Sequence, residues 1–142
     1  YGITTLLKSH LRGNKLLFIG KKGIEHQKII TDPISISFIK RVLTIKGPLL
    51  FYDRDGNKIT PSDLNLFLKE NVQSNITCKD IRTYSANKIF MAFMRKMKIP
   101  NNEIDRKKNV LKGIDYTAEQ LGNTRKICKD SYLCPENIKM FI

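Results

Sequence analysis

The chain has 142 residues, 41% of them hydrophobic, and a formal net charge of +13 at pH 7. This length and apolar content are sufficient for one domain with a hydrophobic core, and they exclude a disordered tail. The basic excess, with a pI near 9.8, predicts a polyanionic partner, most simply a nucleic acid. A ribosome-like basic protein and a membrane-surface binder are the plainer alternatives. No stretch reaches the ~18 apolar residues of a membrane span, and we expect no signal peptide.

The cysteine count predicts neither a disulfide framework nor a metal site. The three cysteines, Cys78, Cys128 and Cys134, are odd in number and lack paired spacing, which favours reduced thiols in an intracellular compartment. His10 and His26 lie far from them in the sequence, and no further His or Cys completes a zinc set. We therefore predict no metal.

Residues 8 to 30 have the pattern of antiparallel strands. His10–Asn14 offers a strand and a Gly-Asn turn, and Lys15–Ile19 is a short apolar run. Gly20–Gly23 is a turn with a glycine at each end, after which Glu25–Ile30 is expected to pair back as a hairpin.

The middle of the chain predicts helices. Residues 34–45 alternate like a strand at first, but their apolar positions share one helical face, which favours a helix. Residues 49–52 are expected to be extended. Thr60–Asp63 has the cap, first-turn proline and acidic residue that open a helix. The apolar residues expected to form its core stripe are Leu64, Phe67, Leu68 and Val72.

The longest predicted helix begins at Thr77, which with Asp80 forms a capping box, and ends near Met97 before Pro100. Its apolar residues recur at helical spacing, so we expect it to be the central core helix. These residues are Ile81, Ile89, Phe90, Phe93, Met94 and Met97.

The C-terminal third predicts shorter elements. Residues 101–112 are charged and are expected to form a short surface helix or connector. Thr117 resembles the start of a capping box, and Gly122 is suited to end that helix because glycine adopts the left-handed C-cap conformation. Thr124 can cap a following short helix, which Pro135 would discourage from continuing. Residues after Pro135 are expected to add a last turn or two of helix.

Tyr132 is the candidate reactive residue. A tyrosine in a domain of this kind is most often half-buried, with its hydroxyl at the wet edge of a core. Tyr132 differs because it follows a run that contains Arg125, Lys126 and Lys129, which we expect to contact DNA. A phenol with a pKa of about 10 attacks a phosphate only where fixed cations and donors stabilise the developing charge.

The surrounding sequence resembles a known active-site segment. Leu121-Gly122-Asn123, with Tyr132 nine positions after Asn123, is similar to the C-terminal segment of type IB DNA topoisomerases and tyrosine recombinases. These families usually carry a histidine where this chain has Asn123. An amide N–H can still donate to a phosphate oxygen, but it cannot carry a positive charge.

Two further segments extend the resemblance. Residues 79–83, Lys-Asp-Ile-Arg-Thr, differ by one conservative change from the family segment whose arginine holds the scissile phosphate. This implies that role for Arg82, whose planar fork can donate two hydrogen bonds, and makes Lys79 a second candidate contact. In the family, a lysine at a hairpin tip enters the minor groove as the general acid; Lys21 matches it, with Lys22 as the fallback. The plainer interpretation is an arginine paired with a carboxylate and lysines that face solvent.

The resemblance implies a type IB topoisomerase catalytic domain over residues 1–142, of the compact form found in poxviruses, other large DNA viruses and bacteria. The implied fold is α+β, mostly helical, with a small N-terminal antiparallel hairpin or sheet. The implied activity is relaxation of supercoiled double-stranded DNA through a 3′-phosphotyrosyl intermediate, without nucleotide, metal or other cofactor. We expect an intracellular monomer, in the virion or the site of viral DNA replication if viral, and in the cytoplasm if bacterial.

Two parts of the family pattern are missing from the chain. The first catalytic arginine of the family lies upstream of the hairpin, and Arg12 does not match it. The N-terminal DNA-clamping domain is missing as well. We therefore expect the 142 residues alone to be weak or inactive.

Two alternatives remain open from the sequence. A tyrosine recombinase uses the same chemistry but usually has a histidine three positions before the second arginine, where this chain has Lys79. A non-catalytic basic DNA-binding domain would bind DNA without forming a covalent adduct.

Overall fold

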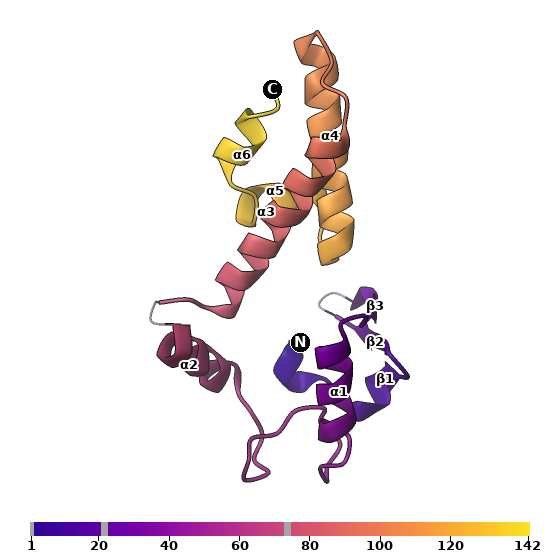
Figure 1. Ribbon diagram of the computed structural model, residues 1–142, viewed down its shortest axis with the longest axis vertical. Coiled ribbons are helices and arrows are strands. Elements are labelled where there is room, and N and C mark those ends of the chain that lie inside the picture. The colour runs from indigo at the N-terminus through magenta and orange to yellow at the C-terminus, as the bar shows by residue number, and fades with distance from the viewer. Residues whose placement is uncertain (1, 21–22, 73–74) are drawn as a thin grey trace. The chain divides into compact units, whose positions relative to one another are not determined.

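The chain folds into two compact units, Tyr1–Asn71 and Val72–Ile142, and each has its own hydrophobic core. The computed structural model describes residues 2–20, 23–72 and 75–142 (Figure 1). The first unit contains a small antiparallel sheet and the second is helical, which confirms the predicted α+β class. Whether residues 1–142 act as one catalytic domain stays a prediction.

The sheet of the first unit has three antiparallel strands in the order β1-β2-β3. They are β1 (Leu11–Arg12), β2 (Lys15–Ile19) and β3 (Glu25–Ile29). The register places Phe18 opposite His26. Both predicted hairpins are confirmed, although the first strand is shorter than expected.

The core of the first unit joins residues of the sheet, the end of α1 (Pro33–Val42) and the segments around Leu6 and Leu50. The Asp32 side chain caps this helix by accepting from the backbone N–H of Ser35 at 2.7 Å. The predicted helix over 34–45 is confirmed, with an earlier end. Two 3-10 turns, η1 (Ile3–Thr5) and η2 (Lys8–His10), precede the sheet. The buried core residues are Leu6, Val42 and Leu50.

The helix predicted after Thr60 is present as α2 (Pro61–Val72), and Asp63 accepts hydrogen bonds from the Thr60 backbone and hydroxyl at 2.8 and 2.7 Å. The prediction that this helix carries a core stripe is wrong, because none of the residues of α2 is buried. Phe67 is 60% exposed and Val72 is 49% exposed. Helical spacing defines an apolar face, but it does not say whether another element covers that face.

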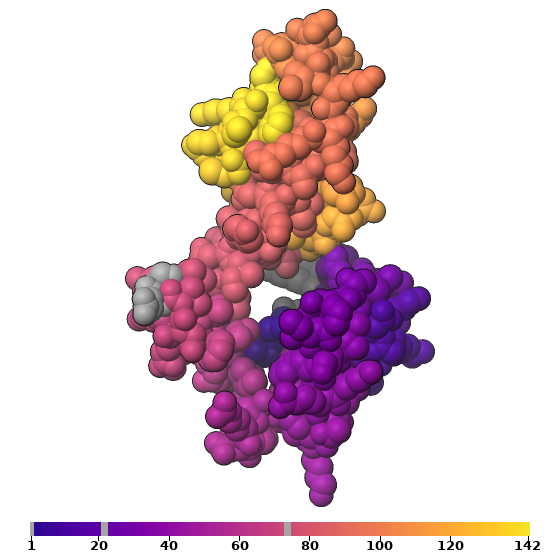
Figure 2. All heavy atoms as spheres, viewed as in Figure 1, coloured from indigo at the N-terminus to yellow at the C-terminus, as the bar shows by residue number. Residues whose placement is uncertain are grey.

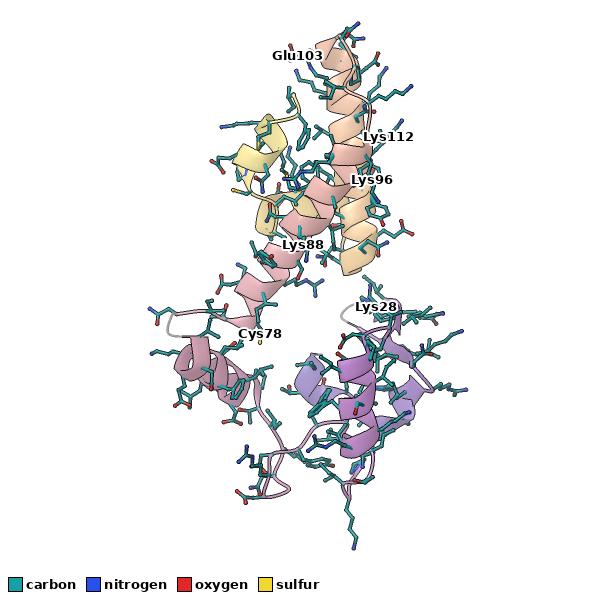
Figure 3. All side chains as sticks on the ribbon, viewed as in Figure 1. Lys28, Cys78, Lys88, Lys96, Glu103 and Lys112 are labelled. Carbon is teal, nitrogen blue, oxygen red and sulfur yellow. The ribbon has the colours of Figure 1, made fainter. Side chains whose placement is uncertain are left out.

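The second unit is built on α3 (Cys78–Lys96) and α4 (Glu103–Leu121). The predicted central core helix is confirmed, since α3 buries Phe90 completely and Met94 almost completely. Ile81 is the exception at 46% exposed, because it lies in the first turn, N-terminal to the packed stretch. Charged side chains project from both helices, among them the labelled Lys88 and Lys96 of α3 and Lys112 of α4 (Figure 3).

The prediction of separate elements at 101–112 and from Thr117 is wrong, because α4 runs unbroken from Glu103 to Leu121. Thr117 is fully buried inside this helix, and its hydroxyl donates to the carbonyl of Gly113 at 2.8 Å rather than capping a helix start. A Cβ at Gly113 would lie 2.7 Å from Met94 Sδ, so glycine permits close contact with α3. The buried stripe of α4 is Val110, Gly113, Ile114, Thr117 and Ala118.

Two short helices complete the second unit, α5 (Arg125–Ser131) and α6 (Pro135–Lys139). The C-terminal residues pack against α3, visible as yellow spheres beside it in Figure 2. Phe141 meets Phe90 edge-on with ring centroids 6.0 Å apart. In the described part of the chain, every helix is too short or too polar to cross a membrane.

Candidate active site

The start of α3 positions the predicted phosphate-binding arginine. The Thr77 hydroxyl caps the helix and Asp80 reaches back to the Thr77 backbone N–H at 2.9 Å, as the capping box predicted. Asp80 also accepts from the Thr77 hydroxyl, and these hydrogen bonds lower the pKa of Asp80. Asp80 is therefore engaged with the cap, and Arg82 in the next turn is left to other partners.

Arg82 reaches across to the end of α4. Its Nη2 donates to the carbonyl of Leu121 at 2.6 Å and to Asn123 Oδ1 at 3.3 Å. Among the described residues, no carboxylate forms a salt bridge with Arg82. The carbonyls at a helix C-terminus lack intrahelical donors and carry partial negative charge, so a guanidinium is well suited to this place.

The end of α4 has the conformation that the sequence predicted. Gly122 is left-handed, with φ 65° and ψ 41°, and the backbone N–H of Asn123 returns to the carbonyl of Ala118 at 2.8 Å. Asn123 follows directly, with Oδ1 turned towards Arg82. Its Nδ2 is buried and has no acceptor among the described residues. An unpaired buried donor is destabilising, so this atom favours an added acceptor.

Tyr132 lies at the C-terminal cap of α5 and is half-buried. Thr124 caps the start of this helix through the backbone N–H of Ile127, as predicted. The Arg82 Cζ lies 5.2 Å from the centroid of the Tyr132 ring, which is the range of a cation–π contact. The phenol is thus at the edge of the core beside a guanidinium, rather than deep among aliphatic side chains.

Cys128 lies one turn before Tyr132 and anchors α5 in the core. It is fully buried, and its carbonyl accepts from the backbone N–H groups of Tyr132 and Leu133, each at 3.1 Å. Burial raises the pKa of the Cys128 thiol, and the nearby charge of Arg82 opposes part of that rise. The thiol therefore stays neutral and serves packing.

Three of the four predicted catalytic side chains, Arg82, Asn123 and Tyr132, therefore come together within the second unit, from three different helix ends. They offer a fixed cation, an amide donor without an acceptor and a phenol. This set can hold an anionic tetrahedral group beside a nucleophile.

Comparison with known proteins gives the family. Residues 1–140 match the family model described as eukaryotic DNA topoisomerase I, catalytic core. The chain belongs to the topoisomerase I catalytic-core family. It is also 31% identical over 156 aligned residues to the DNA topoisomerase 1B of Acanthamoeba polyphaga mimivirus. That match covers 99% of this chain and 46% of the viral protein, so the chain spans about half the length of that relative.

The other predicted DNA contacts of the second unit differ in whether a carboxylate already pairs with them. Arg125 forms a two-point ion pair with Asp115, at 2.5 and 2.6 Å, and this pairing raises its pKa. A phosphate would have to compete with Asp115 for Arg125. Lys126 and Lys129 are exposed on α5, with Lys126 3.8 Å from the carboxylate of Asp130.

Lys79 is exposed in the first turn of α3, three residues before Arg82. It forms none of the salt bridges found among the described residues. It is therefore available at the helix N-terminus, where the backbone N–H groups also favour an anion. Its assignment as a DNA contact stays a prediction.

The predicted general acid Lys21 and its fallback Lys22 lie outside the described residues. On either side of them, the backbone N–H of Gly20 donates to the carbonyl of Ile24 at 2.7 Å. A Cβ at Gly20 would lie 2.5 Å from the His26 ring, so any larger residue here would have to displace that ring. The roles of Lys21 and Lys22 therefore stay predictions.

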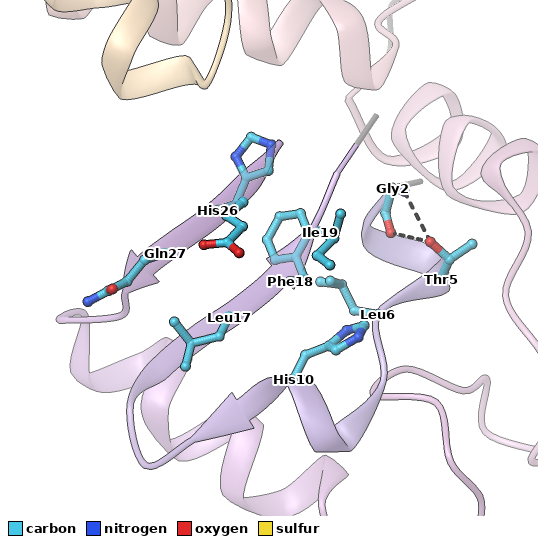
Figure 4. Close-up of a pocket in the computed structure, with 10 residues that line it drawn as sticks. Gly2, Thr5, Leu6, His10, Leu17, Phe18, Ile19, His26 and Gln27 are labelled. Atoms are coloured by element: carbon cyan, nitrogen blue, oxygen red, sulfur yellow. Dashed lines mark hydrogen bonds between the residues drawn. The ribbon is translucent and has the colours of Figure 1, made fainter. Parts of the chain in front are cut away.

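A hollow of about 840 Å³ in the first unit is lined by residues of β2, β3 and the N-terminal segment that precedes the sheet (Figure 4). Phe18 lies in it between two histidines that are far apart in the sequence. The His26 ring stacks on Phe18 at 4.9 Å and the His10 ring is 6.4 Å away. Among the described residues, no three His, Cys, Asp or Glu side chains lie close enough together to hold a metal ion.

Asn87 is the site residue that sequence reasoning missed. It lies on α3 and donates to the Tyr132 carbonyl at 2.8 Å. Only its place five residues after Arg82 could have drawn attention to it, and a polar residue on a core helix has many uses.

Proposed function

We propose that the protein relaxes supercoiled double-stranded DNA by type IB strand transfer, with Tyr132 as the nucleophile. The observation that carries the proposal is the approach of the Arg82 guanidinium to both the Tyr132 ring and the Asn123 amide. The family membership and the charge of +13 favour DNA as the substrate.

The reaction conserves the phosphodiester energy. Tyr132 Oη attacks the scissile phosphorus, which forms the 3′-phosphotyrosyl bond and breaks the bond to the 5′ oxygen. The phenol proton passes to solvent, and the departing 5′ oxygen takes a proton, a step assigned by prediction to Lys21. Rotation of the broken strand releases supercoils, and the 5′-hydroxyl then attacks the phosphotyrosine to restore the strand. The balance requires neither ATP nor metal.

Arg82 and Asn123 stabilise the charge on the non-bridging oxygens. Arg82 uses one nitrogen for the end of α4 and retains further N–H donors for phosphate. Asn123 offers the Nδ2 donor that has no acceptor in the described structure. Removing either donor is expected to lower the rate by about 10²–10³-fold.

The decisive experiment is covalent trapping with the longest natural form of the protein that contains this chain. The substrate is a suicide duplex, in which the short fragment that carries the new 5′-hydroxyl dissociates after cleavage, so that the strand cannot be resealed. It is mixed with the protein in EDTA and without ATP, and covalent adducts are separated in denaturing gels. The wild-type protein should form an adduct and relax plasmid, whereas Tyr132→Phe should do neither. Tyr116→Phe is the matched control, since Tyr116 belongs to the same unit and its ring stacks on Phe93.

The same assay tests the alternative functions. A wild-type protein that binds DNA without any adduct would overturn the proposal in favour of a non-catalytic DNA-binding domain. Adducts that form only when two specific duplexes are paired would favour a recombinase. We also propose that the protein acts as a monomer inside cells, and in the virion or the infected cell if its source is viral.

A further inference from the structure

A pocket of about 340 Å³ lies at one end of the second unit, where the end of α3, the start of α4 and the residues that follow α6 meet (Figure 1). The three proposed catalytic side chains of this unit, Arg82, Asn123 and Tyr132, are not among the residues that line it. Small-molecule sites in proteins are mostly apolar hollows of about 300–1,000 Å³ with few polar groups. By its size and its place in the unit, this pocket is therefore a candidate for a second binding site.

The walls of the pocket are mainly apolar and rich in methionine. The apolar lining residues are Met94, Met97, Ile99, Pro100, Met140 and Phe141. Met94 is 4% exposed and belongs to the core, whereas Met140 is 69% exposed, so the lining leads from the core to solvent. Methionine is unbranched and flexible, and its side chain therefore adjusts to the outline of a ligand. These walls suit an unbranched apolar tail.

Arg106 of α4 brings a positive charge to this apolar lining. Its Nε–H is buried and has no acceptor among the described residues. Arg106 also forms none of the salt bridges found in the described part of the chain. A buried donor without a partner is destabilising, and a guanidinium donates well to a carboxylate, through two parallel N–H groups. The unused donor therefore favours a ligand that carries a carboxylate.

The carboxylates nearest to Arg106 in the sequence already pair with lysines. Glu103 lies 2.5 Å from Lys107 Nζ, and Asp105 lies 2.9 Å from Lys108 Nζ. A carboxylate brought by a ligand would meet the Arg106 guanidinium without displacing either of these pairs. The charge at the pocket is thus complementary to an anionic ligand.

We propose that this pocket binds a small amphipathic carboxylate, with the carboxylate on the Arg106 guanidinium and the apolar tail among Met94, Met97 and Met140. The size of the pocket favours a small molecule over a segment of another protein, and the unpaired guanidinium favours an acid over a neutral lipid. The inference does not depend on the proposed function, because it uses no residue assigned to the reaction with DNA.

The four methionines of this chain provide the readout. Their methyl groups are labelled with carbon-13 in the longest natural form of the protein that contains this chain, and octanoate is added below the concentration at which it forms micelles. The NMR signals of Met94, Met97 and Met140 should shift along one saturable curve. Met91 packs against the same core but does not line the pocket, so its signal should shift far less. A response that does not saturate, or an equal shift of Met91, would overturn the inference.

A neutral ligand and a variant test the part played by the charge. Octan-1-ol has the same tail without the carboxylate and should bind at least ten-fold more weakly than octanoate, because a hydrogen bond between charged groups contributes a factor of about 10–100 to affinity. Arg106→Met keeps an apolar side chain and should weaken octanoate binding by about 10–100-fold, while the affinity for octan-1-ol changes by less than about two-fold. Lys107→Met removes a neighbouring exposed charge and is the matched control, with octanoate affinity within two-fold of wild type.

Three results would contradict the inference. Equal affinities of the wild-type protein for octanoate and octan-1-ol would refute the carboxylate, as would an Arg106→Met variant that binds octanoate as tightly as wild type. A shift of the same three methyl signals with protein concentration alone would show that a second copy of the chain fills the pocket. If Arg106→Met fails to fold, the comparison of the two ligands on the wild-type protein decides by itself.

Discussion

The two units differ in how completely they bury their apolar residues. In the second unit a continuous core joins α3, α4, α5 and α6, and Phe90, Ile114 and Cys128 in it are almost completely buried. The described core of the first unit has three buried residues, and α2 buries none of its side chains. The proposed nucleophile and its phosphate-binding partners all belong to the better packed unit.

This difference has a physical rationale. Strand transfer depends on reacting groups that are held within about 0.5 Å of a productive arrangement, and a dense core supplies that rigidity. The hairpin that carries the predicted general acid belongs to the less packed unit, where local opening is easier. The comparison therefore predicts that mutations in the second unit have the larger effects.

The largest stability effect should come from the core of the second unit. Phe90→Ala removes a fully buried ring between α3 and α4, and we expect it to destabilise that unit by about 3–5 kcal/mol. Phe67→Ala on α2 removes a ring that is 60% exposed, so its effect should stay within about 0.5 kcal/mol. Hydrogen exchange of the α3 and α4 amides measures the unit by itself. Equal effects of the two variants would refute the comparison.

A smaller change in stability is expected for Gly113→Ala, which should destabilise the fold although this substitution usually stabilises a helix. Replacing a mid-helix glycine by alanine normally stabilises by about 0.5–1 kcal/mol. At Gly113 the new methyl group would lie 2.7 Å from Met94 Sδ and 3.0 Å from a Phe90 ring carbon. We expect Gly113→Ala to destabilise by about 1–3 kcal/mol. Thermal unfolding checks the sign, with the exposed neighbour Lys112→Ala as control.

The same position explains what the sequence could and could not predict. The charged stretch 101–112 indicated a short surface element and the capping-box-like start at Thr117 indicated a new helix, so α4 was divided in two. In the folded unit, the stripe through Ile114 and Thr117 packs on α3, and tertiary contact overrides the local signal. The helix start at Thr77 and the helix end at Gly122 were predicted correctly because each is decided by local hydrogen bonds.

The candidate site shows the same difference between local features, which the sequence predicts, and tertiary contacts, which it does not. The resemblance of their segments to the family pattern identified Arg82, Asn123 and Tyr132 as candidates, and the structure brings them together. The ion pair between Asp115 and Arg125 and the hydrogen bond from Asn87 to the Tyr132 backbone could not be predicted, because both contacts join residues at least ten positions apart. Such pairings depend on how helices pack, which a single sequence does not reveal.

An intermediate effect is expected at the cap of α5. Thr124 accepts from the backbone N–H of Ile127, and Thr124→Ala should destabilise the helix by about 1 kcal/mol. Thr124→Ser keeps the hydroxyl and is the control. The core contact of Cys128 should keep the helix folded, so hydrogen exchange should quicken in α5 and stay unchanged in α3. Faster exchange throughout the unit would indicate that the cap supports more than this helix.

The smallest effects concern acid sensitivity, where the two units should behave alike. Hydrogen bonds from Ser35 lower the pKa of Asp32 in the first unit, and those from Thr77 lower the pKa of Asp80 in the second. A carboxyl whose folded pKa lies below its unfolded value stabilises the fold above the unfolded pKa, and this contribution is lost as the pH falls through the folded pKa.

Removing the donors tests this similarity. Thr77→Val and Ser35→Ala should each raise the pKa of the partner carboxyl towards its ordinary value, as measured by carboxyl carbon NMR titration. Each variant should also lose less stability on acidification than the wild type, because its folded and unfolded pKa values lie closer together. An ordinary pKa for Asp80 in the wild type would contradict the capping box that places Arg82. Because both helix starts are local and exposed, their behaviour depends on the cap alone, and the contrast between the units belongs to their cores.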